Sequence, residues 1–349
     1  MTPLKTAVRH PPAAAEAATT DLQTDNQKTT RRTGHFLHPK TGLAMVDWTA
    51  YNLIRSPYFT SPLGPPTEPA SLFVGHEREL PEALSAVAAG NHHMVMARRG
   101  MGSTSFTNCL KEQSASLGVA SHLEPVLMNG RASPNDLMIQ IVQSTWNALV
   151  PSRPEGTEAR TAFADAAVAA GQSLRGGASA LTRALENAVD KANGIRFILV
   201  HLTMGGIRTA DLQRARKSLV SLHNHGMFSI PSLRFVIEGP TQAVSLVVGQ
   251  EARLRAEIGD YTVLLPITAD ELREALARRY THFQNHPNTD VTPPVDIEAA
   301  VQLHDLLNGE LRRTFYVLGR TASLISRHGQ SRTGSWDDVL QALHARGRL

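Results

Sequence analysis

The stretch Val95–Leu110, VMARRGMGSTSFTNCL, has the outline of a phosphate-binding loop. An apolar strand leads into a glycine-bearing turn, and small hydroxyl residues open the helix that follows. Such a loop binds phosphate because successive backbone N–H groups at a helix N-terminus point at the anion. A lysine usually completes the loop, but this sequence has Ser103 in that place. The stretch therefore predicts a nucleotide-binding fold and leaves open whether its chemistry survives.

The composition is that of a packed protein, not of a strongly basic nucleic-acid coat. Of the 349 residues, 42% are hydrophobic and 19% are charged, and the formal net charge is +4. The single cysteine, Cys109, excludes an intramolecular disulfide and a cysteine-rich zinc site. No apolar run reaches the roughly 18–20 residues of a membrane-spanning helix, and the N-terminus lacks the apolar core of a secretory signal. We expect a cytoplasmic protein without a membrane partner.

Downstream of about residue 71, apolar stretches of strand length alternate with stretches of helical periodicity. Strands are expected at 92–97, 121–129, 195–202, 233–239 and 261–266. Helices are expected at 103–117, 133–150, 178–194, 209–223 and 241–256, and from 268 onward the pattern is helical only. This alternation predicts a three-layer α/β fold with a parallel sheet, followed by an all-helical lid.

Four segments follow from these patterns and from composition. They are a flexible tail at 1–45, a proline- and aromatic-rich strap at 46–70, an α/β core at 71–267 and a helical lid at 268–349. The tail is poor in large apolar residues and cannot offset its ordering entropy. The aromatic residues of the strap are expected to pin it to a domain surface. Within the core, 151–172 looks like a surface insertion, and the helix at 133–150 has Ser133 or Asn135 near its cap.

Six short motifs, in this order along the chain, resemble those of the AAA+/STAND P-loop ATPases. The resemblance is strongest to the branch near the origin-recognition and Cdc6-like proteins and the bacterial transposition or defence ATPases. The motifs are FVGHEREL (73–80), ARRGMGSTS (97–105), FILVHL (197–202), LRFVIEGP (233–240), LLPITADELREAL (264–276) and NGELRR (308–313). In that family they correspond to the opening motif, Walker A, Walker B, sensor 1, the segment leading into the lid and sensor 2. The resemblance covers about residues 70–345 and implies a P-loop NTPase core.

The resemblance assigns the phosphate loop to nine residues, of which some retain the family pattern. They are Ala97, Arg98, Arg99, Gly100, Met101, Gly102, Ser103, Thr104 and Ser105. Gly100 and Gly102 keep the turn open, and Thr104 could supply the hydroxyl that touches magnesium. The lysine that contacts the β- and γ-phosphates in the family is absent. Lys111 begins about 10 Å further along the helix and cannot easily swing back.

The other motifs lack the acidic groups of an active site. At Walker B, His201 stands where a carboxylate holds magnesium, and Leu202 stands where an acid polarises the attacking water. The sensor-1 position falls on Glu238 or its neighbour, and a carboxylate there would repel the γ-phosphate. Arg312 and Arg313 are sensor-2-like, with three readings left open: a sensor remnant, a partner contact or a solvated helix face. We therefore predict no catalytic residues and a scaffold whose catalytic charges have been removed.

The histidines offer no persuasive metal site in the sequence. His92 and His93 begin the first strand, and HNH (223–225) follows a helix, but neither has paired carboxylates or cysteines nearby. We interpret them as surface or cap histidines.

Three functions remain in competition. The first is an inactive P-loop pseudo-ATPase that serves as a protein-binding, assembly or regulatory subunit and contacts a protein partner or sibling AAA+ subunits. It requires no cofactor, would bind ATP or ADP at most weakly, and needs no metal. The second is a DNA-associated subunit of an initiator, transposition or defence complex, which a steep salt dependence of DNA binding would support. The third is an ATPase with a divergent site.

Overall fold

The computed structural model describes residues 46–64, 68–122, 124–128, 132–150, 157–189, 194–329 and 331–345. All of these residues belong to one compact unit. The tail predicted at 1–45 lies outside the described residues.

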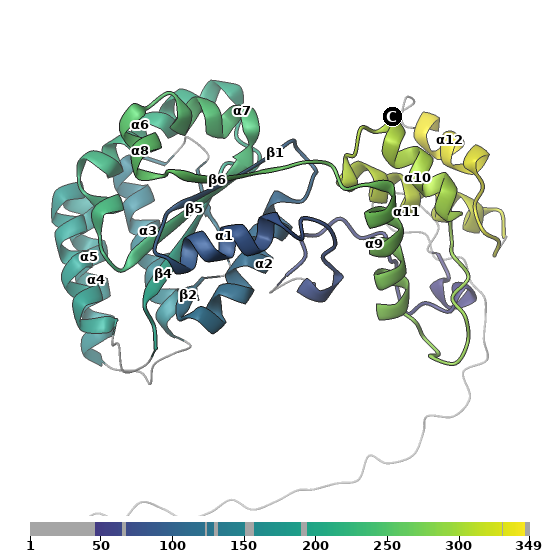
Figure 1. Cartoon of the computed structure of the whole chain (residues 1–349), viewed down its shortest axis with the longest axis horizontal. Coiled ribbons are helices and arrows are strands. Elements are labelled where there is room, and N and C mark those ends of the chain that lie inside the picture. Colours follow the sequence, from purple (N-terminus) through teal and green to yellow (C-terminus); the bar gives the residue numbers. More distant parts are fainter. Residues whose placement is uncertain are drawn as a thin grey trace, which may run out of the picture. The chain divides into compact units, whose positions relative to one another are not determined.

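A six-stranded parallel sheet forms the centre of the α/β core (Figure 1). Its strands are β1 His93–Ala97, β2 Val119–Ser121, β3 Val126–Leu127, β4 Phe197–Thr203, β5 Leu233–Pro240 and β6 Asp260–Leu264. The order across the sheet is β2-β4-β5-β1-β6, and β3 pairs with the end of β4. The stretch predicted as one strand at 121–129 contains only the last residue of β2 and the whole of β3, and both of these short strands lie on the same side of β4. The strand carrying the phosphate loop, β1, is separated from β4 by β5.

Helices cover both faces of the sheet, as the alternation predicted. The core helices are α1 Glu79–Ala88, α2 Ser103–Ser114, α3 Pro134–Leu149, α4 Thr157–Gln172, α5 Leu174–Ala188, α6 Leu212–Asn224, α7 Thr241–Val244 and α8 Ala252–Glu257. One face packs against α1 and α2 through residues such as Val95, Leu199 and Val236. The opposite face packs against the remaining helices through Leu202 and Phe235. The core is therefore a three-layer α/β fold, and the layer containing α2 is the one that bears the phosphate loop.

Local capping explains where several of these helices begin. Of the two candidate caps for α3, the structure uses Ser133, whose side chain accepts a hydrogen bond from the Asp136 backbone in a reciprocal capping box. Thr268 and Glu271 form the same arrangement at the start of the lid. Caps of this kind satisfy backbone N–H groups that have no partner within the helix.

The prediction of a surface insertion at 151–172 is wrong for its described part. Residues 157–172 form helix α4, which packs against α3 and α5. Phe163, Ala166 and Ala170 are fully or almost fully buried in the core. These positions share one helical face, but alanine contributes little hydrophobic contrast, so the sequence pattern of this face is weak.

The helix predicted at 241–256 is also interrupted. It consists of α7, a π-helical turn at Ser245–Gly249 and the short helix α8. Two further residues predicted to be exposed are buried: His92 and His93 are 6% and 3% exposed. His92 hydrogen-bonds the Phe228 carbonyl and the Phe235 amide, and His93 hydrogen-bonds the hydroxyl of Thr262. Their polar atoms join neighbouring elements of the core, which is why these histidines are not surface residues.

The lid is built from four helices and the strap. The helices are α9 Ala269–His282, α10 Ile297–Leu306, α11 Leu311–Arg327 and α12 Trp336–His344. The strap begins with a 3₁₀ turn, Trp48–Tyr51, and buries Tyr51, Leu53 and Tyr58 in the hydrophobic cluster of the lid. Its aromatic residues do pin it to a surface, and that surface is the lid.

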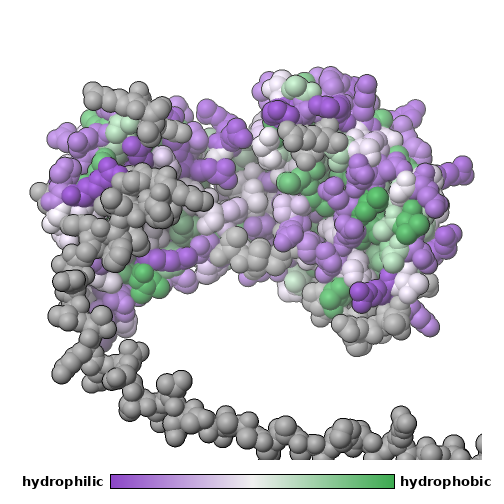
Figure 2. Space-filling view, turned by 180° about the vertical axis from the view of Figure 1, so that it is seen from behind, coloured by the Kyte–Doolittle hydropathy of each residue, from purple (hydrophilic) through white to green (hydrophobic). Residues whose placement is uncertain are grey.

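Hydrophobic residues form only scattered patches on the face shown in Figure 2, which is otherwise mostly hydrophilic. No helix in the described part of the chain combines the length and the apolar character needed to cross a membrane.

Candidate functional site

The stretch that follows β1 forms a phosphate loop. β1 ends at Ala97, and α2 begins at Ser103. Gly100 and Gly102 have φ angles of +85° and +92°, a left-handed conformation that glycine adopts without strain. A Cβ atom on Gly100 would lie 2.7 Å from Cγ of Glu310 in the lid, so this glycine also permits the lid to approach. The backbone of the loop is therefore retained, as predicted from its glycines.

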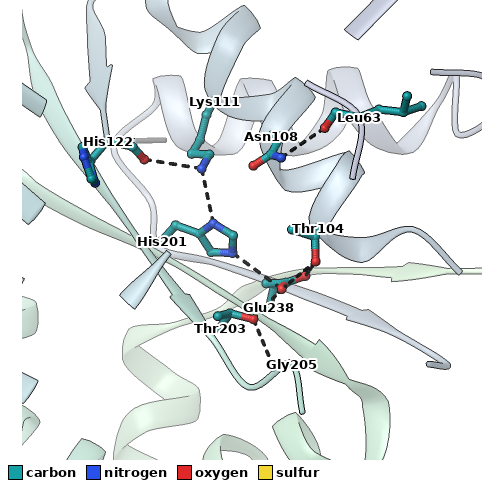
Figure 3. A network of polar contacts seen from close by, with 9 residues as sticks. All are labelled: Leu63, Thr104, Asn108, Lys111, His122, His201, Thr203, Gly205 and Glu238. Carbon is teal, nitrogen blue, oxygen red and sulfur yellow. Dashed lines mark hydrogen bonds and ion pairs between the residues drawn. The ribbon is translucent and has the colours of Figure 1, made fainter. Parts of the chain in front are cut away.

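Lys111 does not replace the missing lysine of the loop, where Arg98 and Arg99 are the cationic residues that line the adjoining cavity. Its side chain is buried, and its Nζ atom lies 3.4 Å from Nδ1 of His201 and 3.4 Å from the carbonyl of His122. Burial lowers the pKa of Lys111 to about 8, although the charge of Glu238 counteracts part of this effect. The ammonium group points towards His201, which lies on β4 (Figure 3).

Glu238 on β5 is the centre of the polar contacts beneath the loop. It is 1% exposed and accepts hydrogen bonds from the hydroxyls of Thr104, at 3.1 Å, and Thr203, at 2.5 Å. Burial by itself would raise the pKa of Glu238, but His201 and the hydroxyls of Thr203 and Ser103 lower it to about 2. The carboxylate is therefore ionised, and the Thr104 hydroxyl, which the sequence left free for magnesium, donates to it.

His201 lies between the buried lysine and the buried carboxylate (Figure 3). Its Nε2 atom is 3.8 Å from Oε1 of Glu238, too far for a hydrogen bond but close enough for electrostatic attraction. Burial lowers the pKa of His201, so the ring is neutral near pH 7. Because the Lys111 ammonium donates to Nδ1, the ring proton belongs on Nε2, facing Glu238. We call this set of three side chains the Lys111–His201–Glu238 array.

The register of the sheet refines the Walker B assignment. Thr203, not His201, lies level with Glu238, which in turn lies level with Val95 of β1. His201 is two residues deeper along β4, on the same face of the sheet as Thr203. Leu202 points to the opposite face, where it is fully buried in the hydrophobic core. The structure therefore brings Thr203 to the loop, whereas Leu202 takes no part in the site.

The two lid arginines are in different positions. The backbone N–H of Arg312 donates to the Gly100 carbonyl at 3.1 Å, and Arg312 lines the cleft beside the loop. Arg313 does not line this cleft, and its Nε atom is buried without a partner among the described residues. Of the predicted pair, only Arg312 lies where a side chain from the lid could meet a phosphate.

Two cavities adjoin the loop, and both are lined by Gly100, Ser103, Thr104 and Arg312. The phosphate side, which also includes Glu238, has a volume of about 360 Å³. The other cavity lies between the loop and the lid and has a volume of only about 110 Å³. We call it the nucleoside side, because a nucleotide whose phosphates occupied the loop would extend into it.

Comparisons with solved structures agree with the α/β fold described above. No protein-family model matches the chain, and no curated protein matches it by sequence. Among solved structures, it is similar to the Aeropyrum pernix ORC2 protein in ADPNP and ADP complexes, with a TM-score of 0.54 and 14% identity over 84% of this chain and 72% of that one. It is also similar to the Aeropyrum pernix ORC1 protein in complex with DNA, with a TM-score of 0.52 and 16% identity over 84% of this chain and 70% of that one. The chain has the AAA+ P-loop fold of the ORC/Cdc6 type.

An AAA+ fold implies a magnesium nucleotide, and the residues present do not fit one. Glu238 and Thr104 offer oxygen atoms suited to magnesium, but the hydroxyl and the carboxylate already bond each other. No lysine side chain is available at the loop, where Ser103 stands. The nucleoside side, at about 110 Å³, is well below the roughly 300 Å³ at the lower end of pockets for drug-sized ligands.

Sequence reasoning missed Thr203 and the partner of Lys111. One signal was present for both: alternation along β4 places residues 201 and 203 on the same face of the sheet. The contribution of the strap to the cleft had no local signal, because it depends on contacts between residues far apart in the chain.

Proposed function

We propose that this chain is a catalytically inactive AAA+-type subunit that serves as a protein-binding, assembly or regulatory module. The observation that carries the proposal is the Lys111–His201–Glu238 array beneath the loop. In it, the buried cation of α2 faces a histidine, and the buried carboxylate bonds the loop hydroxyl. These are the charges that phosphoryl transfer would need to direct at a nucleotide and its metal.

Energetic magnitudes support the loss of turnover. A hydrogen bond to a charged group contributes roughly 1.5–3 kcal/mol net, and every 1.4 kcal/mol is a factor of ten in an equilibrium or a rate. The loop lacks the lysine, and Leu202 cannot orient water from within the hydrophobic core. Losses at several catalytic groups that act together remove most of the rate enhancement of an enzyme.

An exposed apolar stripe on the edge strand supports a protein partner. Tyr261, Val263 and Leu265 alternate along β6 and the residue after it, and are 62%, 40% and 64% exposed. β6 is the last strand of the sheet, and apolar side chains on an edge strand favour association with another chain.

Co-purification of the chain from its native cells tests the proposal. We expect a stoichiometric protein partner or sibling AAA+ subunits, with little bound nucleotide. Replacement of Tyr261 and Leu265 by serine should release that partner, whereas serine at Tyr316, an exposed aromatic of the lid, is the matched control. A chain that is recovered alone and hydrolyses ATP would contradict the proposal.

A DNA-associated role is the second candidate. The observation that favours it is the similarity to the ORC1 protein solved in complex with DNA. If this chain binds DNA through its arginines, the logarithm of the affinity should fall linearly with the logarithm of salt concentration. No measurable binding at low salt would exclude this candidate.

A further inference from the structure

The nucleoside side of the cleft is lined by a segment of the chain's own strap. Residues 59–63 form part of its wall, opposite the phosphate loop and the lid helices α9 and α11. Phe59 and Leu63 stand at the two ends of this segment, which we call the plug. This cavity has a volume of about 110 Å³, against about 360 Å³ for the phosphate side.

The plug is attached to the helix that follows the phosphate loop. The Leu63 N–H donates to the Ser105 hydroxyl at 2.9 Å. The Asn108 side-chain amide donates to the Leu63 carbonyl at 3.1 Å (Figure 3). The next residue, Gly64, has a φ of +85°, and a Cβ atom there would lie 2.6 Å from Cβ of Asn108. The chain therefore approaches α2 as closely as a glycine permits.

The plug is also attached to the lid, through Arg279. This arginine is 5% exposed and donates to the carbonyls of Pro57, at 2.9 Å, and Phe59, at 3.2 Å. Its guanidinium lies 4.1 Å from the centre of the Phe59 ring and 3.9 Å from the centre of the Phe315 ring. Burial lowers the pKa of Arg279 to about 9, with Glu68 opposing the shift, so the side chain remains charged near pH 7.

The two cavities share residues of the phosphate loop, and this connection determines where the parts of a bound nucleotide would lie. A nucleotide with its phosphates at Ser103 and Thr104 must place its sugar and base in the nucleoside side. We propose that residues 59–63 are a built-in plug that occupies the place of the nucleoside, so that a nucleotide binds only after this segment has left. The inference rests on the proposed function, because it concerns the regulation of the same cleft.

The plug lowers affinity without touching the phosphates. If a site is open only for a fraction of the time, the apparent dissociation constant rises by the reciprocal of that fraction. The bonds made by Leu63 and Arg279 would have to break before each binding event. ATP and ADP therefore bind weakly, even where the loop backbone could receive their phosphates.

Binding of ADP to a plug-weakened variant tests the proposal. The double substitution Phe59→Ala and Asn108→Ala removes the ring that lines the nucleoside side and one bond that holds Leu63. We expect this variant to bind ADP at least tenfold more tightly than the wild type in titration calorimetry. The matched control is Tyr58→Phe, which removes a buried hydrogen bond to Tyr280 from the strap residue next to the plug, a residue that does not line the cavity.

The outcomes separate the plug from the proposed function. Equal ADP affinities of variant and wild type, or no binding by either, would overturn the plug and leave the inactive subunit standing. Tighter ADP binding together with ATP turnover by the variant would support the plug and refute the inactive subunit.

A second measurement covers the case in which the variant does not fold. In the wild type, saturating ADP should accelerate hydrogen exchange at the Leu63 amide at least tenfold, because that amide loses the Ser105 hydroxyl. Unchanged exchange at Leu63 with ADP bound would refute the plug.

Discussion

On the phosphate side of the cleft, single side chains differ from those of an active P-loop site, whereas on the nucleoside side a whole segment of the chain lies where a ligand would bind. The first side retains its backbone and its open volume of about 360 Å³. The second side has a volume of about 110 Å³ and is lined in part by residues 59–63. The two proposals therefore concern different sides of one cleft, substitution of single side chains on one side and occupation by a segment on the other, and experiments can separate them.

Substitution of Arg279 should cause the largest loss of stability, because this side chain holds the plug against the lid. Arg279→Ala leaves the carbonyls of Pro57 and Phe59 without their donor and removes the cation between two aromatic rings. We expect the free energy of unfolding in urea to fall by about 3–5 kcal/mol. Arg273→Ala on the same helix breaks only exposed ion pairs with Asp270 and Glu298 and should cost less than about 1 kcal/mol. If the two variants lost similar amounts of unfolding free energy, the bonds from Arg279 to the strap would contribute no more to stability than exposed ion pairs do.

Mild acid should lower the free energy of unfolding through buried histidines on both sides of the cleft, because burial also lowers the pKa of His76, which lines the nucleoside side. Burial lowers the pKa of His201. It also lowers the pKa of His93 to about 4, and both histidines lie level with Val236 of β5 in the sheet. The unfolded chain therefore binds more protons than the folded chain below about pH 6.5, so stability falls as pH falls from 6.5 towards 4. For His93 alone the loss is on the order of 3 kcal/mol. Arg279 keeps its charge over this range. Urea unfolding between pH 7.5 and 4.5 checks this, and a flat profile would contradict the neutral state of these histidines.

The array on the phosphate side should behave as one energetic unit. Lys111→Met and Glu238→Gln each remove one charged end of the array around His201, so their effects on unfolding free energy should be non-additive by about 1 kcal/mol or more. By contrast, Lys111→Met and Phe59→Ala act on different sides of the cleft and should add within about 0.5 kcal/mol. Strong coupling between the two sides would mean that they are not separable.

The smallest effect should be the coupling between the missing lysine and the plug. Ser103→Lys returns a lysine to the phosphate loop but leaves the plug in place. Because the plug scales the apparent affinity by one factor, the lysine should tighten ADP binding equally, within about twofold, in the wild type and in the Phe59→Ala/Asn108→Ala variant. A gain that differs strongly between the two backgrounds would show that the two sides of the cleft are coupled.

Much of the fold was predictable from the sequence, because its signals are local. The apolar run 195–202 and the glycines around Met101 mark a buried strand and a phosphate loop wherever they occur. Helix α4 escaped prediction because alanines carry little of its buried face. The break at Ser245–Gly249 has no residue in the sequence that we can identify as its cause.

The site was predictable only in part. Substitutions at Ser103 and His201 are visible in an alignment of motifs, and both residues do lie beneath or beside the loop. The plug was not predictable, because Phe59 and its neighbour Pro57 contact Arg279, more than 200 positions away in the chain. The hydrogen bond from Thr104 to Glu238 likewise depends on which strands are neighbours in the sheet.

Magnesium-dependent release of phosphate from ATP tests the central claim most directly. We predict that the purified wild-type chain and its Thr104→Ala variant release phosphate at the same background rate, because the loop hydroxyl already serves Glu238. Turnover by the wild type that requires magnesium and disappears in Thr104→Ala would contradict the account.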